Sequence, residues 1–337
     1  MVVIDAHSDY ALHVYREHIR GRDDILKEQH LPFLRKGGVN IEVLTVGGDF
    51  DLFPEFDPQN YNATIQVFNS IRNEISNDPD LFSLIKNSKD FDGIKNNKIG
   101  FILALEGARS IEDDFNRLHR YYDLGLRSIA LTHNMKNQFA DGCAENPAGG
   151  LSNLGKKFIE ELNNLNILID LSHISEPSFW DVLDIIEKPP IATHSNAKSL
   201  CNHARNLTDA QIESIAERNG VVGMNFFNIF IDENKKSVTA ERLIDHIEYI
   251  VDLVGIDYVG LGPDFLNYYI EDLKDLDEQL ADPFGDLLEA DDVFEVMGDI
   301  SQFPKLFELI QKRGYSDKEV RKIQGDNFLR VFKKILK

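Results

Sequence analysis

Short apolar runs alternate with amphipathic segments along most of the chain, and this alternation constrains the fold more than any other feature. The runs are rich in Val, Ile and Leu and fit buried strands; they lie at 2–7, 40–47, 99–106, 127–133, 167–173, 190–194, 220–226 and 258–264. Strands that are apolar on both faces and alternate with helices form parallel sheets. About eight such units in one chain predict a (β/α)8 TIM barrel.

The segments between the runs carry helix signals. In 153–166 the apolar residues recur at the spacing of one helix face, and 239–255 ends on a glycine. The segment 208–219 opens with Thr208 and has Gln211 three residues later, which is the pattern of a capping box. No glycine-rich phosphate-binding fingerprint follows the first run, which argues against a dinucleotide-binding sheet.

Composition and charge narrow the class of protein. The chain has 337 residues, 42% of them hydrophobic, which is enough to bury a large core, and we expect a single barrel domain over 1–337. Asp and Glu number 57 against 36 Lys and Arg, which gives a formal net charge of −21. A chain this acidic is not expected to bind nucleic acid or anionic lipid.

Cysteine usage and hydropathy indicate the compartment. Cys143 and Cys201 lie far apart, form no disulfide framework and fit a reducing environment. The first residues become polar too soon for a signal peptide, and no apolar run is long enough to span a bilayer. We therefore expect a cytoplasmic protein that makes no membrane contact.

One segment departs from the rest of the chain in composition. Residues 271–299 are crowded with acids and contain a single basic residue, Lys274. The segment belongs to an acidic excursion around 266–300, which we interpret mainly as solvated chain after the last strand. The alternative interpretation is a loop over the mouth of the barrel.

Ionisable side chains stand at the ends of most of the apolar runs. They are His7, Asp9, Glu106, His133, His173, His194 and Asp264. In a barrel of parallel strands the C-terminal strand ends meet at one face, where such enzymes build their active sites. Taken singly, each residue has a structural explanation, such as a hydrogen-bonded histidine. Together, the series predicts that residues far apart in sequence converge on one pocket.

A divalent metal explains this convergence best. Burying several histidines and carboxylates together is costly unless a cation compensates for it. Imidazole and carboxylate ligands without a thiolate favour Zn²⁺, with Mn²⁺, Fe²⁺ or Co²⁺ as alternatives. The donors exceed the needs of one tetrahedral zinc and fit two cations about 3.5–4 Å apart that share a carboxylate and a bridging hydroxide. The pattern predicts an amidohydrolase-like barrel that hydrolyses a carbonyl-type or phosphoryl-type bond.

The ordered series of motifs resembles a known family. "IDAHSD", "ALEGARSI", "LTHN", "DLSHIS", "ATHSNAKSLCNHARNLTDAQI" and "GLGPDF" are similar, nearly end to end, to the zinc-dependent membrane dipeptidases, which include renal dipeptidase and bacterial relatives. The resemblance implies that the chain is a binuclear zinc metallopeptidase that cleaves dipeptides through a metal-bridging hydroxide. Members are often dimers, so the resemblance also suggests a homodimer. The membrane location of the secreted animal members is not implied, because their anchoring segments have no counterpart here.

The resemblance also implies roles for single residues. His7 and Asp9 bind one metal, His173 and His194 bind the other, and Glu106 bridges the two.

Three further residues receive roles in the reaction from the same resemblance. His133 steadies the oxyanion of the tetrahedral intermediate. Arg205 binds the C-terminal carboxylate of the substrate, which suits its planar guanidinium. Asp264 handles the proton that passes to the leaving amine.

Two departures from the family pattern concern the surroundings of the scissile bond. Arg109 stands where the family often has a histidine, and Leu266 and Asn267 follow the Asp264-Phe265 pair where the family often has Asp-Gly. An alternative is the same metal barrel acting on another carboxylate-bearing amide, a lactone or a phosphoester. A catalytically silent barrel that serves as a binding or scaffold protein is disfavoured, because none of the expected metal ligands is missing.

Overall fold

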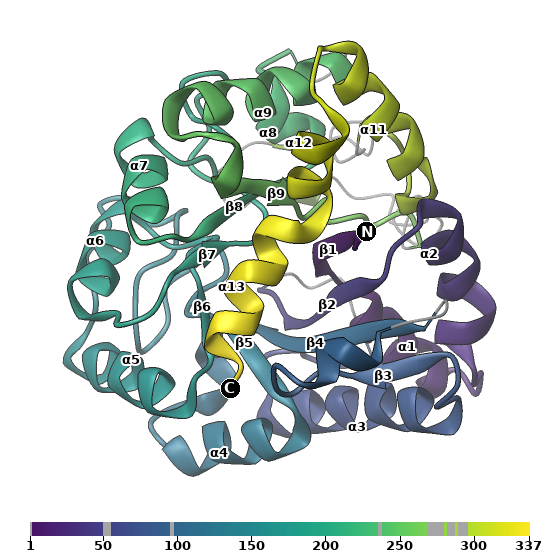
Figure 1. Ribbon diagram of the computed structural model, residues 1–337. Coiled ribbons are helices and arrows are strands. Elements are labelled where there is room, and N and C mark those ends of the chain that lie inside the picture. The colour runs from purple at the N-terminus through teal and green to yellow at the C-terminus, as the bar shows by residue number, and fades with distance from the viewer. Residues whose placement is uncertain are drawn as a thin grey trace.

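Parallel strands run side by side around a common axis in the computed structural model, which describes residues 2–49, 55–94, 98–234, 238–268, 280–281, 287–288 and 296–337 (Figure 1). The eight strands of the barrel pair in the order β1-β2-β4-β5-β6-β7-β8-β9. They are β1 (Ile4–Ser8), β2 (Ile41–Gly47), β4 (Ile99–Glu106), β5 (Leu126–Ala130), β6 (Leu168–Asp170), β7 (Ile191–Ala192), β8 (Val221–Met224) and β9 (Val259–Leu261). The predicted (β/α)8 barrel is confirmed.

The barrel is nearly closed at the seam between β1 and β9. A side-chain carbon added at Gly262, just after β9, would lie 3.5 Å from the β-carbon of Ala6 in β1. The two end strands are therefore neighbours, although no backbone ladder joins them in the described part of the chain. Short strands of two or three residues form much of this half of the barrel.

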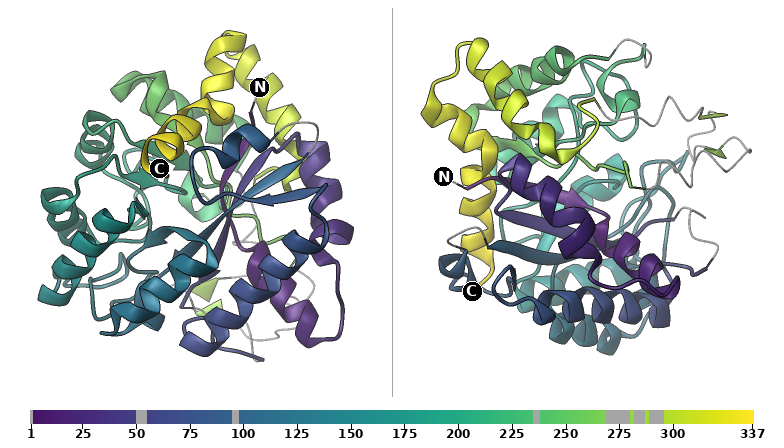
Figure 2. Two further views of the ribbon diagram at one scale, coloured as in Figure 1. Left: turned by 60° about the horizontal axis from the view of Figure 1, so that its bottom comes forward. Right: turned by 90° about the vertical axis from the view of Figure 1, so that its right-hand side faces the viewer.

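Helices form the outer layer around the strands (Figures 1 and 2). They are α1 (Tyr10–Ile19), α2 (Leu31–Gly37), α3 (Tyr61–Asn77), α4 (Phe115–Leu124), α5 (Asn153–Leu165), α6 (Glu176–Ile185), α7 (Asp209–Glu217), α8 (Asn228–Ile231), α9 (Ala240–Val254), α11 (Phe303–Lys312), α12 (Asp317–Arg321) and α13 (Asn327–Ile335). The capping box of Thr208 and Gln211 forms as predicted and starts α7. Gly255 follows the last residue of α9, where the sequence places the helix stop.

Two small β elements were not predicted from the sequence. β3 (Phe82–Leu84) pairs in parallel with the first three residues of β4. β10 (Leu280–Ala281) and β11 (Leu287–Leu288) pair antiparallel within the acidic excursion. Most of that excursion lies outside the described residues, so neither interpretation of 266–300 is tested.

The strand register brings the C-terminal ends of neighbouring strands to one level. Gly47 pairs with Glu106, Glu106 pairs with Ala130, and Ala130 pairs with Asp170. Asp170 in turn pairs with Ile191. The side chains at the ends of β4 and β6, and those in the loops that follow β6 and β7, therefore meet at the same end of the barrel.

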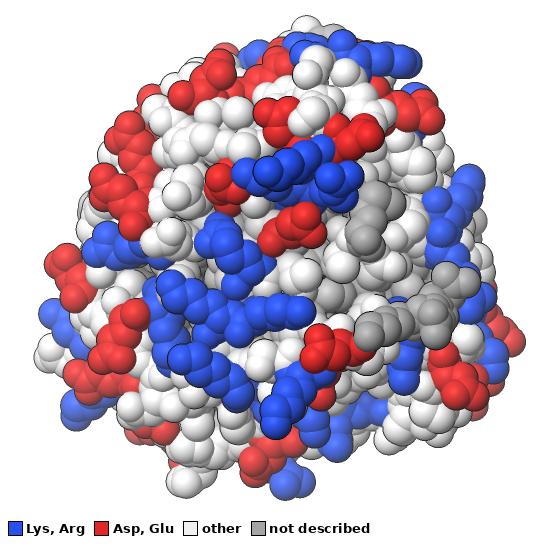
Figure 3. Space-filling model, viewed as in Figure 1, with Lys and Arg blue, Asp and Glu red and all other residues white. Residues whose placement is uncertain are grey.

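The C-terminal helix α13 closes the opposite end. Phe328 and Phe332 are fully buried and belong to the apolar cluster that contains Ile4, Ile41 and Ile191, which lie at the start of their strands. Figure 2 shows α13 at the same side of the barrel as both termini. On this face Lys and Arg gather over α13 and its surroundings (Figure 3), although the whole chain is acidic.

Helix length and hydropathy also bear on the expected absence of a membrane contact. Within the described ranges, no helix combines the length and the apolar character that a membrane span requires.

Candidate metal centre

Three histidine rings converge on one glutamate oxygen at the C-terminal end of the barrel. The Nε2 atom of His173 lies 3.0 Å from Glu106 Oε1, that of His194 lies 3.3 Å away, and that of His7 lies 3.6 Å away. Glu106 is the last residue of β4, and His7 is the fourth residue of β1. All four side chains are buried. The convergence predicted from the sequence is present for these residues.

A glycine lets β2 approach this cluster closely. Gly47 has a φ of 136°, and a side-chain carbon built on it would lie 2.0 Å from the carbonyl oxygen of Glu106. Any other residue would clash with the Glu106 backbone and would be strained at this φ. The end of β2 therefore fixes the position of the Glu106 backbone along the barrel axis.

Hydrogen bonds on the far side of the rings fix the tautomers of His194 and His173. A carboxylate only accepts hydrogen bonds, so the hydroxyl of Thr193 donates its proton to Asp170 Oδ2. The same hydroxyl oxygen therefore accepts from His194 Nδ1, at 2.8 Å. His173 Nδ1 donates to the side-chain oxygen of Asn134 at 2.9 Å. Both ring protons are then on Nδ1, and both Nε2 lone pairs face Glu106.

Within the described ranges, the inner atoms of the cluster have no proton to share in these tautomers. The Nε2 atoms of His173 and His194 lie 2.8 Å apart, with their ring protons on the other side. Among the described residues, Glu106 Oε1 and His7 Nε2 are buried and accept or donate no hydrogen bond. Buried polar atoms are normally satisfied. Lone pairs that face one another without a proton between them are stabilised by a cation, so these donors fit a divalent metal.

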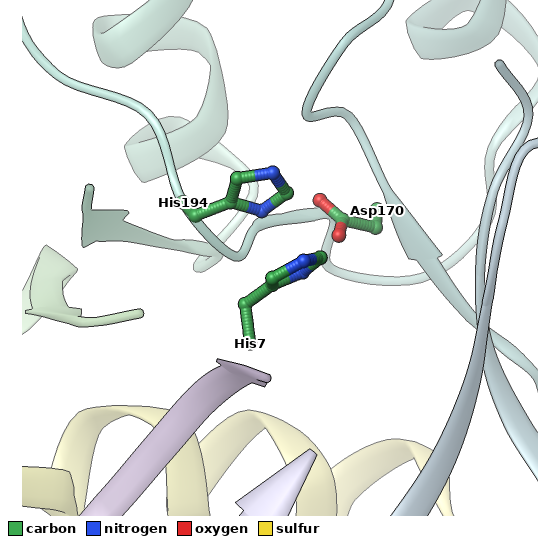
Figure 4. A group of neighbouring side chains, drawn as sticks. All are labelled: His7, Asp170 and His194. Carbon is green, nitrogen blue, oxygen red and sulfur yellow. The ribbon is translucent and has the colours of Figure 1, made fainter. Parts of the chain in front are cut away.

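The potential ligand atoms form overlapping groups. One group is Glu106, His173 and His194, and a second is His7, Asp9 and Glu106; within each, the atoms lie within 4.8 Å of one another. Both groups contain Glu106. A third group of His7, Asp170 and His194 is shown in Figure 4, where the carboxylate and the two rings turn toward one another.

Asp170 differs from the other carboxylates because its oxygens are already used. It accepts from the backbone nitrogens of Ser172 at 2.9 Å and Thr193 at 3.0 Å, and from the Thr193 hydroxyl. A carboxylate held in this way orients a histidine ligand rather than binding the metal itself. We interpret Asp170 as the support of His194.

The electrostatics of the cluster favour bound positive charge. Burial raises the pKa of Glu106 well above its ordinary value, and the nearby charges of Asp9 and Asp264 raise it further. Burial also raises the pKa of Asp9 to about 7. Burial lowers the pKa of His173 and His194 well below the ordinary value. Neutral imidazoles are the ligand form, and the two carboxylates ionise readily only beside a cation.

Asp264 lies beside His7 of the second group and has an unusual backbone. Its Oδ1 atom is 3.6 Å from His7 Nε2, and its Oδ2 atom accepts a hydrogen bond of 3.0 Å from the side-chain amide of Asn225. Asp264 has a φ of 66° and His173 a φ of 64°, in the left-handed region that such residues seldom adopt. Such backbone strain is concentrated at functional sites.

His133 lies beside the second carboxylate oxygen of Glu106, Oε2, whereas the other three rings face Oε1. Its Nε2 atom is 3.9 Å from Glu106 Oε2, and its ring stacks on that of His173 with centroids 4.2 Å apart. Its Nδ1 atom contacts the carboxylate of Asp49, which follows β2. The structure therefore brings His133 to the cluster, as the sequence predicts.

Arg205 reaches the site from the loop after β7. Its side chain is buried and donates to the carbonyl oxygen of His194 at 3.1 Å, while its Nε atom has no partner among the described residues. Arg205 and His173 line one cavity together with Cys143, Lys198 and other residues. A buried guanidinium with a spare donor beside a cavity can bind a carboxylate.

Several supporting residues were missed from the sequence: Asp49, Asn134, Asp170, Thr193 and Asn225. Asp170 carries a detectable signal, because an acid interrupts the apolar run 167–173. The other four have no such signal, since small polar residues are common in loops after strands. Their function depends on neighbours that are distant in the sequence.

The chain is a near-closed parallel barrel whose C-terminal end holds a buried cluster of imidazoles and carboxylates, and this combination defines a barrel protein with a candidate metal centre. The family model for membrane dipeptidase, peptidase family M19, matches residues 1–281 and 284–337, and the chain belongs to this family of metallo-dipeptidases.

Individual relatives agree with this assignment. The chain is 29% identical to an uncharacterized dipeptidase of Schizosaccharomyces pombe, over 98% of this chain and 80% of the relative. It is 28% identical to the dipeptidase aclJ of Aspergillus oryzae, over 97% of this chain and 76% of the relative. Its fold is similar to that of a metallopeptidase of Rhodobacter sphaeroides solved with a phosphinate mimic of L-Ala-D-Ala. For that structure the TM-score is 0.82, the identity is 22%, and 99% of each chain is covered.

Proposed function

We propose that this chain is a binuclear metallohydrolase that cleaves dipeptides. The observation that carries the proposal is the convergence of three histidine Nε2 atoms on Glu106 Oε1, at 3.0, 3.3 and 3.6 Å, with the ring protons of His173 and His194 turned away. Family membership and the dipeptidases among the relatives support the substrate class.

In this proposal the two groups that share Glu106 each hold one cation. His7 and Asp9 would hold the first, His173 and His194 would hold the second, and Glu106 would be a ligand of both. Zn²⁺ fits the donors best, with Mn²⁺, Fe²⁺ or Co²⁺ as alternatives. When bound, such a pair supplies Lewis-acid polarisation of the carbonyl and a nucleophile derived from water at neutral pH.

The surrounding side chains bind and orient the dipeptide. Arg205 receives the C-terminal carboxylate, so the substrate must end at a fixed distance beyond the scissile bond, which excludes peptides extended at the C-terminal side. His133 directs its Nε2 atom toward the carbonyl oxygen and, as a proton donor at this nitrogen, stabilises the charge that develops there. Asp264, held by Asn225, passes the proton to the departing nitrogen.

Metal analysis together with a dipeptide panel tests the proposal. We expect two equivalents of metal per chain and cleavage of dipeptides, with L,L and L,D substrates compared to define the stereochemistry accepted at the second residue. Two equivalents of metal with no cleavage of any dipeptide would refute the substrate and leave a metallohydrolase of another amide, lactone or phosphoester. Absence of metal binding would refute the proposal as a whole.

The role of Arg205 has a separate test. Arg205→Ala should raise KM for dipeptides by roughly 10²-fold or more, since a charge-assisted contact to the substrate is lost, while metal content stays unchanged. Arg218→Ala is the matched control, because Arg218 also donates to a backbone carbonyl, that of Leu183, but is not part of the cluster. An unchanged KM in Arg205→Ala would contradict the role.

A further inference from the structure

We propose that Asp49 is a positioning residue that orients His133 for the reaction. The carboxylate of Asp49 accepts the Nδ1 proton of the His133 ring and directs the opposite nitrogen, Nε2, toward Glu106 and the substrate carbonyl, where Nε2 must itself carry a proton to donate to the oxyanion. This inference rests on the proposed dipeptidase function, because His133 acts on the substrate only within it.

The contacts of Asp49 fix the proton on Nδ1 of His133. The closest neighbour of Nδ1 is Asp49 Oδ1, which can only accept a hydrogen bond. The backbone N–H of Asp49 also approaches Nδ1, at 3.2 Å, and can donate to it only in the other tautomer, so the closer carboxylate decides where the proton lies. The second carboxylate oxygen, Oδ2, accepts from the backbone nitrogen of Met135 at 2.7 Å. Asp49 therefore holds both the ring of His133 and the chain that follows it.

The position of Asp49 follows from the turn after β2. Gly47 has a φ of 136° and Gly48 a φ of 90°, and the backbone nitrogen of Gly48 donates to the carbonyl oxygen of Glu106 at 3.0 Å. The chain thus leaves β2 over the end of β4 and reaches the loop after β5, where His133 lies. Asp49 and His133 are 84 residues apart in sequence, so only the barrel brings them together.

The hydrogen bond from His133 to Asp49 and the stacking of His133 on His173 together fix the orientation of the His133 ring. One face of the ring stacks on His173 at 4.2 Å, Asp49 holds Nδ1, and Nε2 is left 3.9 Å from Glu106 Oε2. Only 4% of the His133 side chain and 13% of the Asp49 side chain are exposed. Without Asp49 the ring loses the hydrogen bond at Nδ1 that sets its χ2 angle, and the direction of Nε2 is no longer fixed by that bond. A misdirected group in an active site costs rate even when binding is intact.

A double-mutant cycle separates positioning from a general structural role. Asp49→Ala should lower kcat roughly 10- to 100-fold, with a smaller change in KM and unchanged metal content. In the His133→Ala background the same substitution should cause no further loss, because Asp49 acts through the ring. Asp49→Asn should retain more activity than Asp49→Ala, since its amide oxygen still accepts from Nδ1. An equal factor in both backgrounds would overturn the inference.

A readout without catalysis tests the same contact. In the metal-free protein, the ¹⁵N signals of the His133 ring are identified by their loss in His133→Ala. They should show a protonated Nδ1 in the wild type and move in Asp49→Ala. Asp141→Ala is the matched control, since Asp141 is a carboxylate in the same loop region that accepts from the backbone nitrogen of Gly149 at 2.6 Å. Unmoved His133 signals in Asp49→Ala would overturn the inference.

The two proposals fail in distinguishable ways. A wild-type protein that cleaves no dipeptide refutes the proposed function, while the ring signals still report whether Asp49 holds His133. A wild-type protein that cleaves dipeptides, together with an Asp49→Ala variant of unchanged kcat, refutes only the positioning role.

Discussion

At the scale of single residues, the candidate centre depends on side chains that contact the histidine rings from behind. Thr193 is the clearest case, because its one hydroxyl donates to Asp170 and accepts from His194. That geometry makes Nε2 of His194 the lone-pair nitrogen. Outer partners of this kind typically contribute 10- to 100-fold, as an order of magnitude, to metal affinity.

Thr193→Val removes this hydroxyl at nearly constant volume. We expect metal affinity to fall roughly 10- to 100-fold, since the His194 ring loses the partner of its Nδ1 proton. Titration of the metal-free protein with Zn²⁺ in a competing chelator measures the change. Thr45→Val is the matched control, because Thr45 is equally buried at the end of β2 and its hydroxyl has no partner in the described structure. Equal affinities of the two variants would contradict the assignment.

The sequence predicts that some residues belong to the centre but gives no sign of others. His7, Glu106, His173 and His194 are polar ends of apolar runs, so strand periodicity and barrel geometry suffice to place them together. Asp49 cannot be found in this way. Its significance depends on a contact with His133 across 84 residues, and the local sequence records only a turn after two glycines.

At the scale of elements, β1 and β2 carry a buried pair of acids behind the site. Asp5 pairs in register with Glu42, and both are fully buried. Burial raises the pKa of Glu42 to about 8, and burial together with the charge of Glu42 raises the pKa of Asp5 well above its ordinary value. The folded protein therefore holds the Glu42 proton that the unfolded chain releases at about pH 4.5.

This pair predicts a loss of stability toward alkaline pH. Because folding raises the pKa of Glu42, its contribution to stability falls as pH rises from about 4.5 to about 8 and is lost above that. Glu42→Gln removes the ionisation, so its melting temperature should fall less between pH 6 and pH 9 than that of the wild type. Thermal unfolding followed by circular dichroism measures this difference.

Glu17→Gln provides the contrast for Glu42→Gln. Glu17 is equally buried but forms an ion pair with Arg22, so its loss should lower the melting temperature at both pH values. If Glu42→Gln shows the same pH dependence as the wild type, the ionisation of Glu42 does not govern alkaline stability.

Helix α13 is the second element with a testable contribution. The ring of Phe328 seals the N-terminal end of the barrel against Gly260, where an added side-chain carbon would lie 2.5 Å from the ring. Phe328→Ala should destabilise the fold by about 3–5 kcal/mol. Since α13 lies at the end of the barrel opposite to the centre, metal stoichiometry in the folded protein should not change. Leu329→Ala, at a half-buried neighbour, should cost less; a loss of metal in Phe328→Ala would contradict this separation.

The sequence pattern predicted the strands of the barrel more reliably than the residues at which those strands begin and end. Each of the eight predicted runs overlaps a strand, but the run 190–194 contains only Ile191–Ala192 as regular strand. The ladder ends early there because the next residues bind the site: Thr193 turns to Asp170 and His194 to Glu106. β3 was not predicted, because a strand of three residues is too short to show the alternation of apolar and polar residues.

At the scale of the whole molecule, the described elements join one barrel whose two ends differ in composition. Polar and ionisable side chains fill the C-terminal end, and phenylalanines of α13 fill the N-terminal end. The single domain over 1–337, the cytoplasmic location and the homodimer stay predictions. The barrel thus has an apolar cluster at one end and buried ionisable groups at the other, where a cation would offset their charge.

Metal and proton should therefore compete for the centre. Metal binding must displace the protons that burial holds on Asp9, with a pKa of about 7, and on Glu106, whose pKa is also raised. The three imidazoles, whose pKa values are lowered, are already neutral in this range. Metal affinity should consequently rise as pH increases through 7 and fall as pH decreases below it.

The same competition governs stability. Without metal, the raised pKa values of Asp9 and Glu106 make stability fall as pH rises from about 4 toward 7 and above. Added Zn²⁺ reverses this effect, with about 2.7 kcal/mol expected at a concentration 100 times Kd. The rise in melting temperature on adding Zn²⁺ to the metal-free protein should thus be larger at pH 8 than at pH 6. An equal rise at both pH values would show that Asp9 and Glu106 do not exchange protons for metal, and no rise at all would show that the cluster holds no metal.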